Sequence, residues 1–163
     1  MNPPIVVRLH PANMDLAEKV GLMRMRSSGN IGRNPHRSQE GRTDEHRRWH
    51  ERLGCMAEAA VAQHLGIPYQ GTVNTFHNEP DVGVFDVRAT DRPDGRLIIR
   101  DNDPADYPYV LAVCDGHSPD VRLVGWLYGW EGRQRRWLRN PHGRRPCWMV
   151  PQDYLHPVPP SPF

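Results

Sequence analysis

Residues Thr43 to Gly66 read TDEHRRWHERLGCMAEAAVAQHLG, and this stretch is the clearest structural signal in the chain. Thr43 is a good N-cap, and the two acidic residues after it suit the positive end of a helix dipole. Apolar residues recur at helical spacing from Trp49 onward, and Gly66 stands where a left-handed C-cap is expected. The stretch therefore predicts a helix from Thr43 to about Leu65.

Small residues crowd the middle of this predicted helix, which indicates that a sheet packs closely against it. They are Gly54, Ala57, Ala59, Ala60 and Ala62. Glu58 lies at the edge of the same apolar stripe, so the sheet would cover its carboxylate in part. A covered carboxylate needs a cation or hydrogen-bond donors, whereas a boundary glutamate that reaches water needs neither. Both interpretations of Glu58 stay open at this point.

Working outward from the helix, the pattern changes to alternation and short apolar runs, which are typical of strands. We expect strands at about 72–76, 83–90, 96–100, 109–114, 122–130 and 147–150. Upstream, residues 5–9 suit a short strand, a helix begins at Asn13 or Asp15 and ends near Arg26, and residues 27–42 form a polar, basic loop. This order predicts an α+β fold with a mostly antiparallel or mixed central sheet, flanked by a long N-terminal helix.

The length of 163 residues fits a single domain, with a helix and basic loop at 1–42, a core at 43–157 and a tail at 158–163. No apolar run approaches the roughly 18 residues of a membrane span. The first residues lack the order of a secretory signal. We therefore expect a soluble, cytoplasmic protein that does not interact with membranes. The three cysteines are widely spaced and form no Cys-x-x-Cys pair, which argues against a zinc ribbon.

Charge is distributed unevenly, although the net charge is only +2. Basic residues predominate in 21–52 and 131–147, whereas residues 79–120 hold ten acidic residues and four arginines. An enzyme that acts on a polyanion would use arginines for phosphates and carboxylates for a cation, although the charges would equally pair across a folded surface. We expect these arginines to contact nucleic acid: Arg47, Arg48, Arg133, Arg135, Arg136, Arg144 and Arg145.

The acidic segment around residues 79–88 is the best candidate for chemistry. Asp86 and Arg88 are two residues apart, so they share one face of the expected strand, while Phe85 and Val87 share the other. Asp81 stands at the strand entry, where its carboxylate can converge with that of Asp86. Two carboxylates repel each other, and a bridging divalent cation relieves the repulsion. The pattern suits magnesium, with a guanidinium for the phosphate.

Several of these motifs, taken in order, resemble small phage-encoded PD-(D/E)XK nuclease-like proteins. The resemblance rests on Gly54–Gly66, Thr72–Phe76, Pro80–Gly83, Asp86–Arg88, Val124–Gly129 and Val150–Gln152, and it covers about Gly54 to Pro157. It implies a restriction-endonuclease-like core, with Mg²⁺ or Mn²⁺ held by Glu58, Asp81 and Asp86. Arg88 would occupy the position of the catalytic lysine.

Two departures from that pattern matter for the function. The gap from Asp81 to Asp86 is short, so both must lie near one bend. Arg88 replaces a lysine and cannot release a proton, which leaves phosphate binding as its role. The implied function is metal-dependent hydrolysis of phosphodiester bonds in DNA, or in RNA. The alternative is a catalytically degenerate nucleic-acid-binding protein of phage origin, and a structural or interaction protein is a third. Whether the protein is a homodimer is left open.

The aromatic residues and histidines allow weaker expectations. Trp126, Tyr128 and Trp130 alternate along one expected strand, so we expect them in the core rather than as base-stacking residues. Trp137 and Trp148 lie among arginines and are better stacking candidates. Other chemistry-bearing residues fit no metal-ligand pattern: His46 and His50 lack a third ligand, and the acids of residues 91–103 sit on turn signals.

Overall fold

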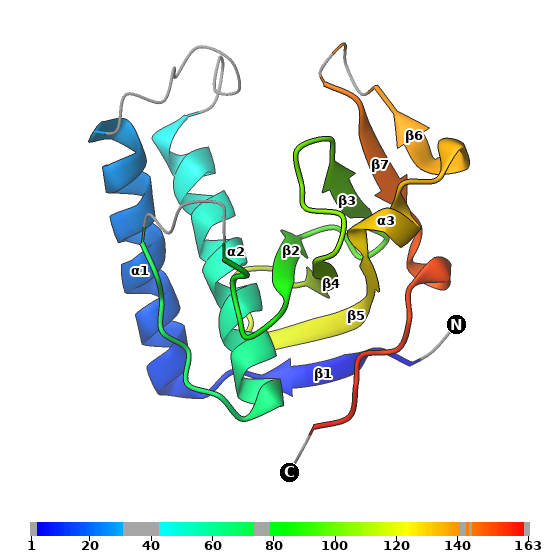
Figure 1. Cartoon of the computed structure of the whole chain (residues 1–163). Helices are drawn as coiled ribbons and strands as arrows, with labels where there is room; N and C mark the ends of the chain where they lie inside the picture. Colours follow the sequence, from blue (N-terminus) through cyan, green and yellow to red (C-terminus); the bar gives the residue numbers. More distant parts are fainter. Residues whose placement is uncertain (1–2, 31–42, 74–78, 141–142, 144, 162–163) are drawn as a thin grey trace.

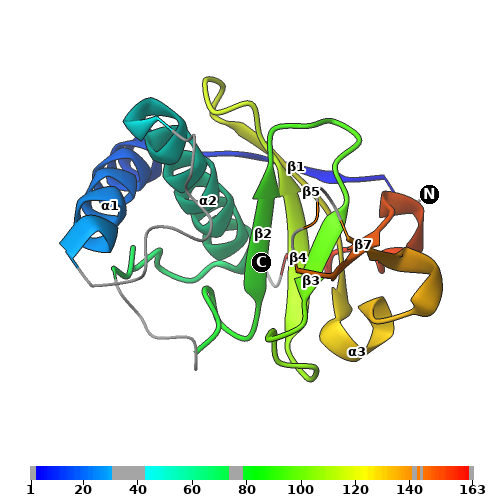
Figure 2. The same ribbon diagram turned by 90° about the horizontal axis from the view of Figure 1, so that it is seen from above.

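The computed structural model describes residues 3–30, 43–73, 79–140, 143 and 145–161. Two helices, α1 (Pro11–Asn30) and α2 (Asp44–Leu65), lie side by side and cover one face of a four-stranded sheet (Figure 1). A smaller three-stranded sheet packs on the other side, as the view from above also shows (Figure 2). The expected α+β class is confirmed.

Helix α2 begins and ends where the sequence predicts. The hydroxyl of Thr43 accepts the N–H of His46 at 3.2 Å, which caps the start. Gly66 adopts the left-handed conformation with φ of 68°, and its N–H bonds to carbonyls of the last turn. The stretch from Cys55 to Ala62 is buried along its whole length, because the small residues there allow α1 and the sheet to approach closely.

Helix α1 is longer than the sequence predicts. It continues through residues 27–30, which we expected to begin the loop, and residues 31–42 of that loop lie outside the described residues. Its buried face holds Ala17 and Val20. At Gly21, an added Cβ would lie 3.3 Å from the backbone nitrogen of Arg52, so this glycine lets the two helices approach closely.

The main sheet has the strand order β1-β5-β4-β2. Strands β1 (Ile5–Arg8) and β4 (Pro108–Val113) pair antiparallel with β5 (Asp120–Tyr128), and β2 (Asp86–Thr90) pairs parallel with β4. The sheet is therefore mixed, and β2 is an edge strand. No strand forms at Thr72 or Val73, and the rest of the strand expected at 72–76 lies outside the described residues.

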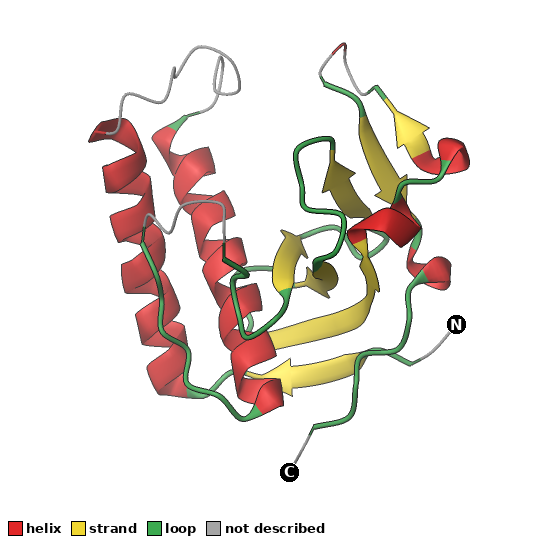
Figure 3. Cartoon of the chain, viewed as in Figure 1, coloured by secondary structure: helices red, strands yellow, loops and turns green. Residues whose placement is uncertain are grey.

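The second sheet has the order β3-β7-β6 and is antiparallel (Figure 3). Its strands are β3 (Leu97–Arg100), β6 (Leu138–Arg139) and β7 (Cys147–Val150). Strand β5 ends two residues before the expected Trp130, because the chain turns into the short helix α3 (Gly129–Gly132). The 3-10 turns η1 (Arg135–Trp137) and η3 (Gln152–Tyr154) flank this sheet.

Two hydrophobic cores lie on opposite faces of the main sheet, and the alternation of β4 separates them. Val110 and Ala112 belong to the core under the helices, whereas Tyr109 and Leu111 belong to the core shared with the second sheet. Asp86 is in register with Tyr109, so the side chain of Asp86 lies on the face turned towards the second sheet. Within the described residues, no helix is long and apolar enough to cross a membrane.

Candidate active site

Glu58 is buried in the structure, with only 6% of its surface exposed, so the interpretation as a boundary residue in water is wrong. Its two carboxylate oxygens accept hydrogen bonds from the guanidinium of Arg24 at 2.7 and 2.8 Å. Arg24 also donates from Nε to the carbonyl of Thr72 at 2.9 Å. Burial raises the pKa of Glu58, and Arg24 opposes this rise. A covered carboxylate needs hydrogen-bond donors, and Arg24 of α1 supplies them to Glu58.

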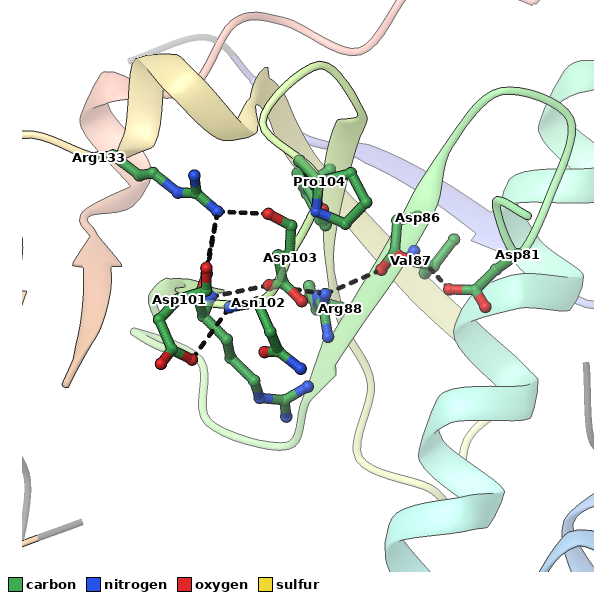
Figure 4. Close-up of polar contacts among 11 residues, drawn as sticks. Asp81, Asp86, Val87, Arg88, Asp101, Asn102, Asp103, Pro104 and Arg133 are labelled. Atoms are coloured by element: carbon green, nitrogen blue, oxygen red, sulfur yellow. Dashed lines mark hydrogen bonds and ion pairs between the residues drawn. The ribbon is translucent and has the colours of Figure 1, made fainter. Parts of the chain in front are cut away.

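Asp81 lies just before β2, in the tight turn that leads into the strand. One of its oxygens accepts the N–H of Val87 at 2.9 Å, which fixes the carboxylate at the start of β2 (Figure 4). The side chain of Asp81 also lines a cavity of about 300 Å³ beside the C-terminal end of α2, together with Tyr69 and Thr72. Its charge raises the pKa of both Glu58 and Asp86, so Asp81 is electrostatically connected to both carboxyls.

Asp86 and Arg88 lie on one face of β2, as their spacing predicts. One guanidinium nitrogen of Arg88, Nη2, is 3.2 Å from Asp86 and 2.9 Å from Asp103. The guanidinium also lies over the ring of Tyr109, at 5.1 Å from its centroid. All three charged side chains are at most 22% exposed. We call Asp86, Arg88 and Asp103 the edge-strand cluster (Figure 4).

Asp103 is the residue of this cluster that the sequence did not single out, because it stands in a turn among several other acids. Its carboxylate accepts the N–H of Arg100 at 2.7 Å, which orients it towards Arg88. Arg133 reaches the same turn and donates to the carbonyls of Arg100, Asp101 and Asp103. Only the packing of the turn after β3 against β2 brings Asp103 to the site, and no sequence spacing reports that packing.

The electrostatics of the edge-strand cluster differ from those of an ordinary ion pair. Partial burial raises the pKa of Asp86 from 3.8 to about 7, while Arg88 opposes the rise and the charges of Asp81 and Asp103 add to it. Asp86 therefore lies near two further acids, Asp81 and Asp103, and near two arginines, Arg88 and Arg100. A carboxyl in this state is stabilised by a proton or by a further cation.

The structure thus brings together the predicted residues in two groups. Asp86 and Arg88 are in contact, Asp81 is close enough to influence Asp86, and Glu58 is held separately by Arg24. Across the residues that the structure describes, no group of three or more His, Cys, Asp or Glu side chains is close enough to hold a metal ion. A site in which three carboxylates converge is therefore not assembled in this arrangement of the side chains.

Asp81 and Asp86 are the two carboxylates that a magnesium ion could use as ligands here. Asp81 and Asp86 each use one oxygen for the contact already described, which leaves the second oxygen of each carboxylate for a cation. Mg²⁺ retains several waters and binds through one or two carboxylates together with a substrate phosphate, so two protein ligands are sufficient. Glu58 does not fit as a direct ligand while both of its oxygens bond to Arg24.

The arginines expected to contact nucleic acid differ in their contacts within the protein and in their exposure. Arg48 pairs with Glu18 at 2.8 Å and Arg47 with Asp44 at 3.4 Å. Arg133 is engaged with the carbonyls of the 100–103 turn. Arg48 is nevertheless exposed, as are Arg135, Arg136 and Arg145, and Arg144 lies outside the described residues. Three of the expected arginines, Arg135, Arg136 and Arg145, are thus exposed around η1 and the start of β7.

Trp126 is half-buried against the helical core, as expected, but Tyr128, Trp130 and Trp137 depart from the expectation. Trp130, expected in the core, is 61% exposed on α3, and Tyr128 is 36% exposed. Trp137, expected to stack on bases, is only 5% exposed, and Arg136 covers its ring with the guanidinium 4.5 Å from the centroid. Trp148 lies under Arg133. Because β5 ends at Tyr128, Trp130 follows the turn of α3 rather than the alternation of the strand.

No family model matches this chain, and neither the curated proteins nor the solved structures include a match to it. The case for a function therefore rests on the residues and their geometry.

Proposed function

We propose that this chain is a metal-dependent phosphodiesterase of the PD-(D/E)XK kind that hydrolyses nucleic acid, with DNA as the first substrate to test. The observation that carries the proposal is the edge-strand cluster, in which two carboxylates share one guanidinium nitrogen, while Asp81, just before the strand, accepts the N–H of Val87. The proposal includes a restriction-endonuclease-like core, in which a helix carries one acid and a mixed sheet carries the others.

The roles follow from the chemistry of each group. Asp81 and Asp86 would hold Mg²⁺ or Mn²⁺, which supplies an activated water and Lewis-acid stabilisation when it is bound. Asp86 must lose its proton to act as a ligand. Because its pKa is raised to about 7, most of the carboxyl groups are ionised only above about pH 7. Arg88 stays charged at working pH, so it contributes a positive charge to the phosphate and no general base.

The substrate contacts beyond the reacting phosphate come from the exposed arginines. Arg135, Arg136 and Arg145 lie on the side of the second sheet, which also carries the turn that holds Asp103. Guanidinium groups bind phosphate oxygens in pairs of hydrogen bonds, so this surface suits a nucleic-acid backbone. Weak binding at raised salt concentration is the expected signature of such contacts.

A second candidate function is nucleic-acid binding without cleavage. It is favoured by one observation, that both oxygens of Glu58 are bonded to Arg24, which removes the helix acid from direct metal binding. In that case the same arginines would bind the phosphates, and the acids of β2 would have only a structural role.

The test is cleavage of labelled DNA and RNA by the full chain with Mg²⁺ or Mn²⁺. Asp81→Ala is expected to abolish cleavage and leave the affinity for DNA nearly intact. Asp81→Asn keeps an oxygen acceptor for the N–H of Val87, so it separates loss of the ligand from damage to the turn. Asp94→Ala is the matched control, because that carboxylate is 83% exposed in a distant turn. A folded wild type that cleaves neither polymer with either metal would exclude the enzyme and leave the binding function.

A further inference from the structure

Four aromatic side chains form a continuous row across the main sheet, and we call them the aromatic row: Phe85, Trp126, Tyr128 and Trp130. The ring centroids of successive neighbours are 6.1, 5.3 and 6.1 Å apart. The last two rings, of Tyr128 and Trp130, are nearly parallel, with an angle of 12° between their planes. The row ends in two flat, adjacent rings that share one orientation.

The end of the row is open to solvent, and its beginning is packed. Phe85 and Trp126 are half-buried against the helical core, whereas Tyr128 is 36% and Trp130 61% exposed. An exposed large aromatic ring does without the favourable free energy that burial of its apolar surface in a core would contribute. Paired rings of this kind are the usual platform on which proteins stack unpaired nucleic-acid bases.

The platform is held rigidly by its surroundings. The N–H of Tyr128 donates to the carboxylate of Glu131 at 2.8 Å, and a second oxygen of that carboxylate contacts the ring of His156 at 2.8 Å. The indole N–H of Trp126 donates to the carbonyl of Pro157 at 3.0 Å. Because these bonds fix the backbone at Tyr128 and the indole ring of Trp126, little conformational entropy would be lost there when a ligand binds.

Both ends of the aromatic row adjoin the segments that carry the acids. Phe85 immediately precedes Asp86 in the chain, although the two side chains point to opposite faces of the sheet. At the other end, the N–H of Trp130 donates to the carbonyl of Ala105 at 2.8 Å, two residues after Asp103. Strand β2 is at the edge of the sheet, so a flexible polymer can pass around it from one face to the other.

The residues that follow the two rings in the chain favour one occupant. The exposed Arg135 and Arg136 follow α3 directly, and Arg139 is exposed a few residues later. A segment that carries exposed aromatic faces and, a few residues later, exposed guanidinium groups suits a polymer with both π-faces and phosphates, which describes an unpaired nucleic-acid strand. An apolar peptide would have no use for these arginines. In a duplex, each base face is covered by the neighbouring base, so the rings of Tyr128 and Trp130 could stack only on the last base pair at an end of the duplex.

We propose that Tyr128 and Trp130 form a base-stacking platform that makes single-stranded nucleic acid the substrate class of this chain. Cleavage of the bound strand rests on the proposed function, whereas binding of the strand does not. Stacking on an unpaired base contributes enough that removal of one ring weakens binding by roughly 5- to 100-fold. Single strands are therefore bound more tightly than duplexes of equal length at the same salt concentration.

The test measures binding in EDTA, where no metal is present and cleavage cannot occur. The probes are a fluorescein-labelled deoxythymidine oligonucleotide and a hairpin duplex of equal length, followed by fluorescence anisotropy. Trp130→Ala is expected to weaken single-strand binding about tenfold, whereas Trp130→Phe retains a ring and stays near the wild type. Val6→Ala, at a 63% exposed position on the far edge strand β1, is the control for lost apolar surface. Thermal unfolding checks that each variant is folded.

Three outcomes would overturn the proposal. The duplex could bind as tightly as the single strand, Trp130→Ala could leave single-strand binding unchanged, or Trp130→Ala could abolish self-association in sedimentation experiments without affecting oligonucleotide binding. The last result would assign the platform to contact between two copies of this chain. Absence of cleavage with Mg²⁺ overturns the nuclease function alone, because the binding measurement needs no metal.

Discussion

Two pairings of arginine with carboxylate lie on either side of β2, and they have opposite characters. Arg24 and Glu58 form a closed pair, in which both carboxylate oxygens are bonded to one guanidinium. In the edge-strand cluster, a single nitrogen of Arg88 is shared by Asp86 and Asp103, and Asp81 adds a further negative charge. The first pair is balanced in charge and the second has an excess of acid.

The difference indicates which group is structural and which is available for chemistry. A buried pair with all its hydrogen bonds made is costly to break, because either partner alone would be an isolated buried charge. A cluster with surplus carboxylate is instead stabilised by an added cation or proton. The pKa values of Glu58 and Asp86 are both raised, so it is the surplus of carboxylate, rather than the pKa, that favours β2 over α2 as the centre of the proposed site.

The largest expected effect comes from removal of the charge of Asp86. Asp86→Asn preserves the shape of the side chain but lowers cleavage by about 1000-fold, because a metal ion supplies several kcal/mol of stabilisation to the reaction. Single-turnover cleavage with Mg²⁺ measures this. Glu58→Gln, on the other side of β2, is the comparison, and an equal loss in that variant without unfolding would mean that both groups take part in the reaction.

The next effect concerns stability. Arg24→Met leaves Glu58 buried without its partner, so the free energy of unfolding is expected to fall by about 3 kcal/mol. Urea denaturation measures the change. Arg8→Met is the control, because Arg8 and Asp120 form a pair with side chains 74% and 44% exposed, and such pairs contribute at most about 1 kcal/mol. Equal, small changes in both variants would show that the buried pair is not structural.

Asp103 is expected to act as a positioning residue for Arg88. Asp103→Asn weakens the hold on the guanidinium and lowers cleavage by roughly 10- to 100-fold, as is usual for groups that orient a reacting residue. The KM for DNA should change less than kcat. Asp101→Asn is the matched control in the same turn, since its carboxylate accepts the neighbouring N–H of Asn102, whereas that of Asp103 contacts Arg88. Equal losses in the two variants would indicate damage to the turn rather than to the position of Arg88.

The smallest effect is the dependence on pH. Because the pKa of Asp86 is raised from 3.8 to about 7, the folded chain retains a proton there that the unfolded chain releases. The contribution of Asp86 to stability is therefore present below pH 3.8 and is lost as pH rises towards about 7. Cleavage changes in the opposite direction, because it needs the ionised carboxylate, and it is expected to rise about tenfold per pH unit up to this value.

Both trends should disappear in Asp86→Asn, which cannot titrate at this position. Denaturation curves collected across the pH range compare the wild type with this variant. A wild type that gains stability relative to Asp86→Asn as pH rises would contradict the raised pKa and would place Asp86 among ordinary paired carboxylates.

Local physical chemistry is sufficient to predict much of the frame. The cap at Thr43, the left-handed Gly66 and the small residues between them define α2 almost to the residue, since each depends on near neighbours in the chain. The two-residue spacing of Asp86 and Arg88 likewise places them on one face of β2. The residues of β2 in the candidate site, but not their partners, were predictable from the sequence.

The partners were decided by the tertiary structure. Arg24 and Asp103 reach the acids and Arg88 through the packing of α1 on α2 and of the 100–103 turn on β2, and neither contact leaves a pattern in the sequence. The exposure of Trp130 depends on where β5 ends, which close contact between Gly129 and the turn at Pro104 decides. Alternation and capping depend on residues a few positions apart, whereas charge balance and exposure depend on elements that are distant in sequence and meet only in the folded chain.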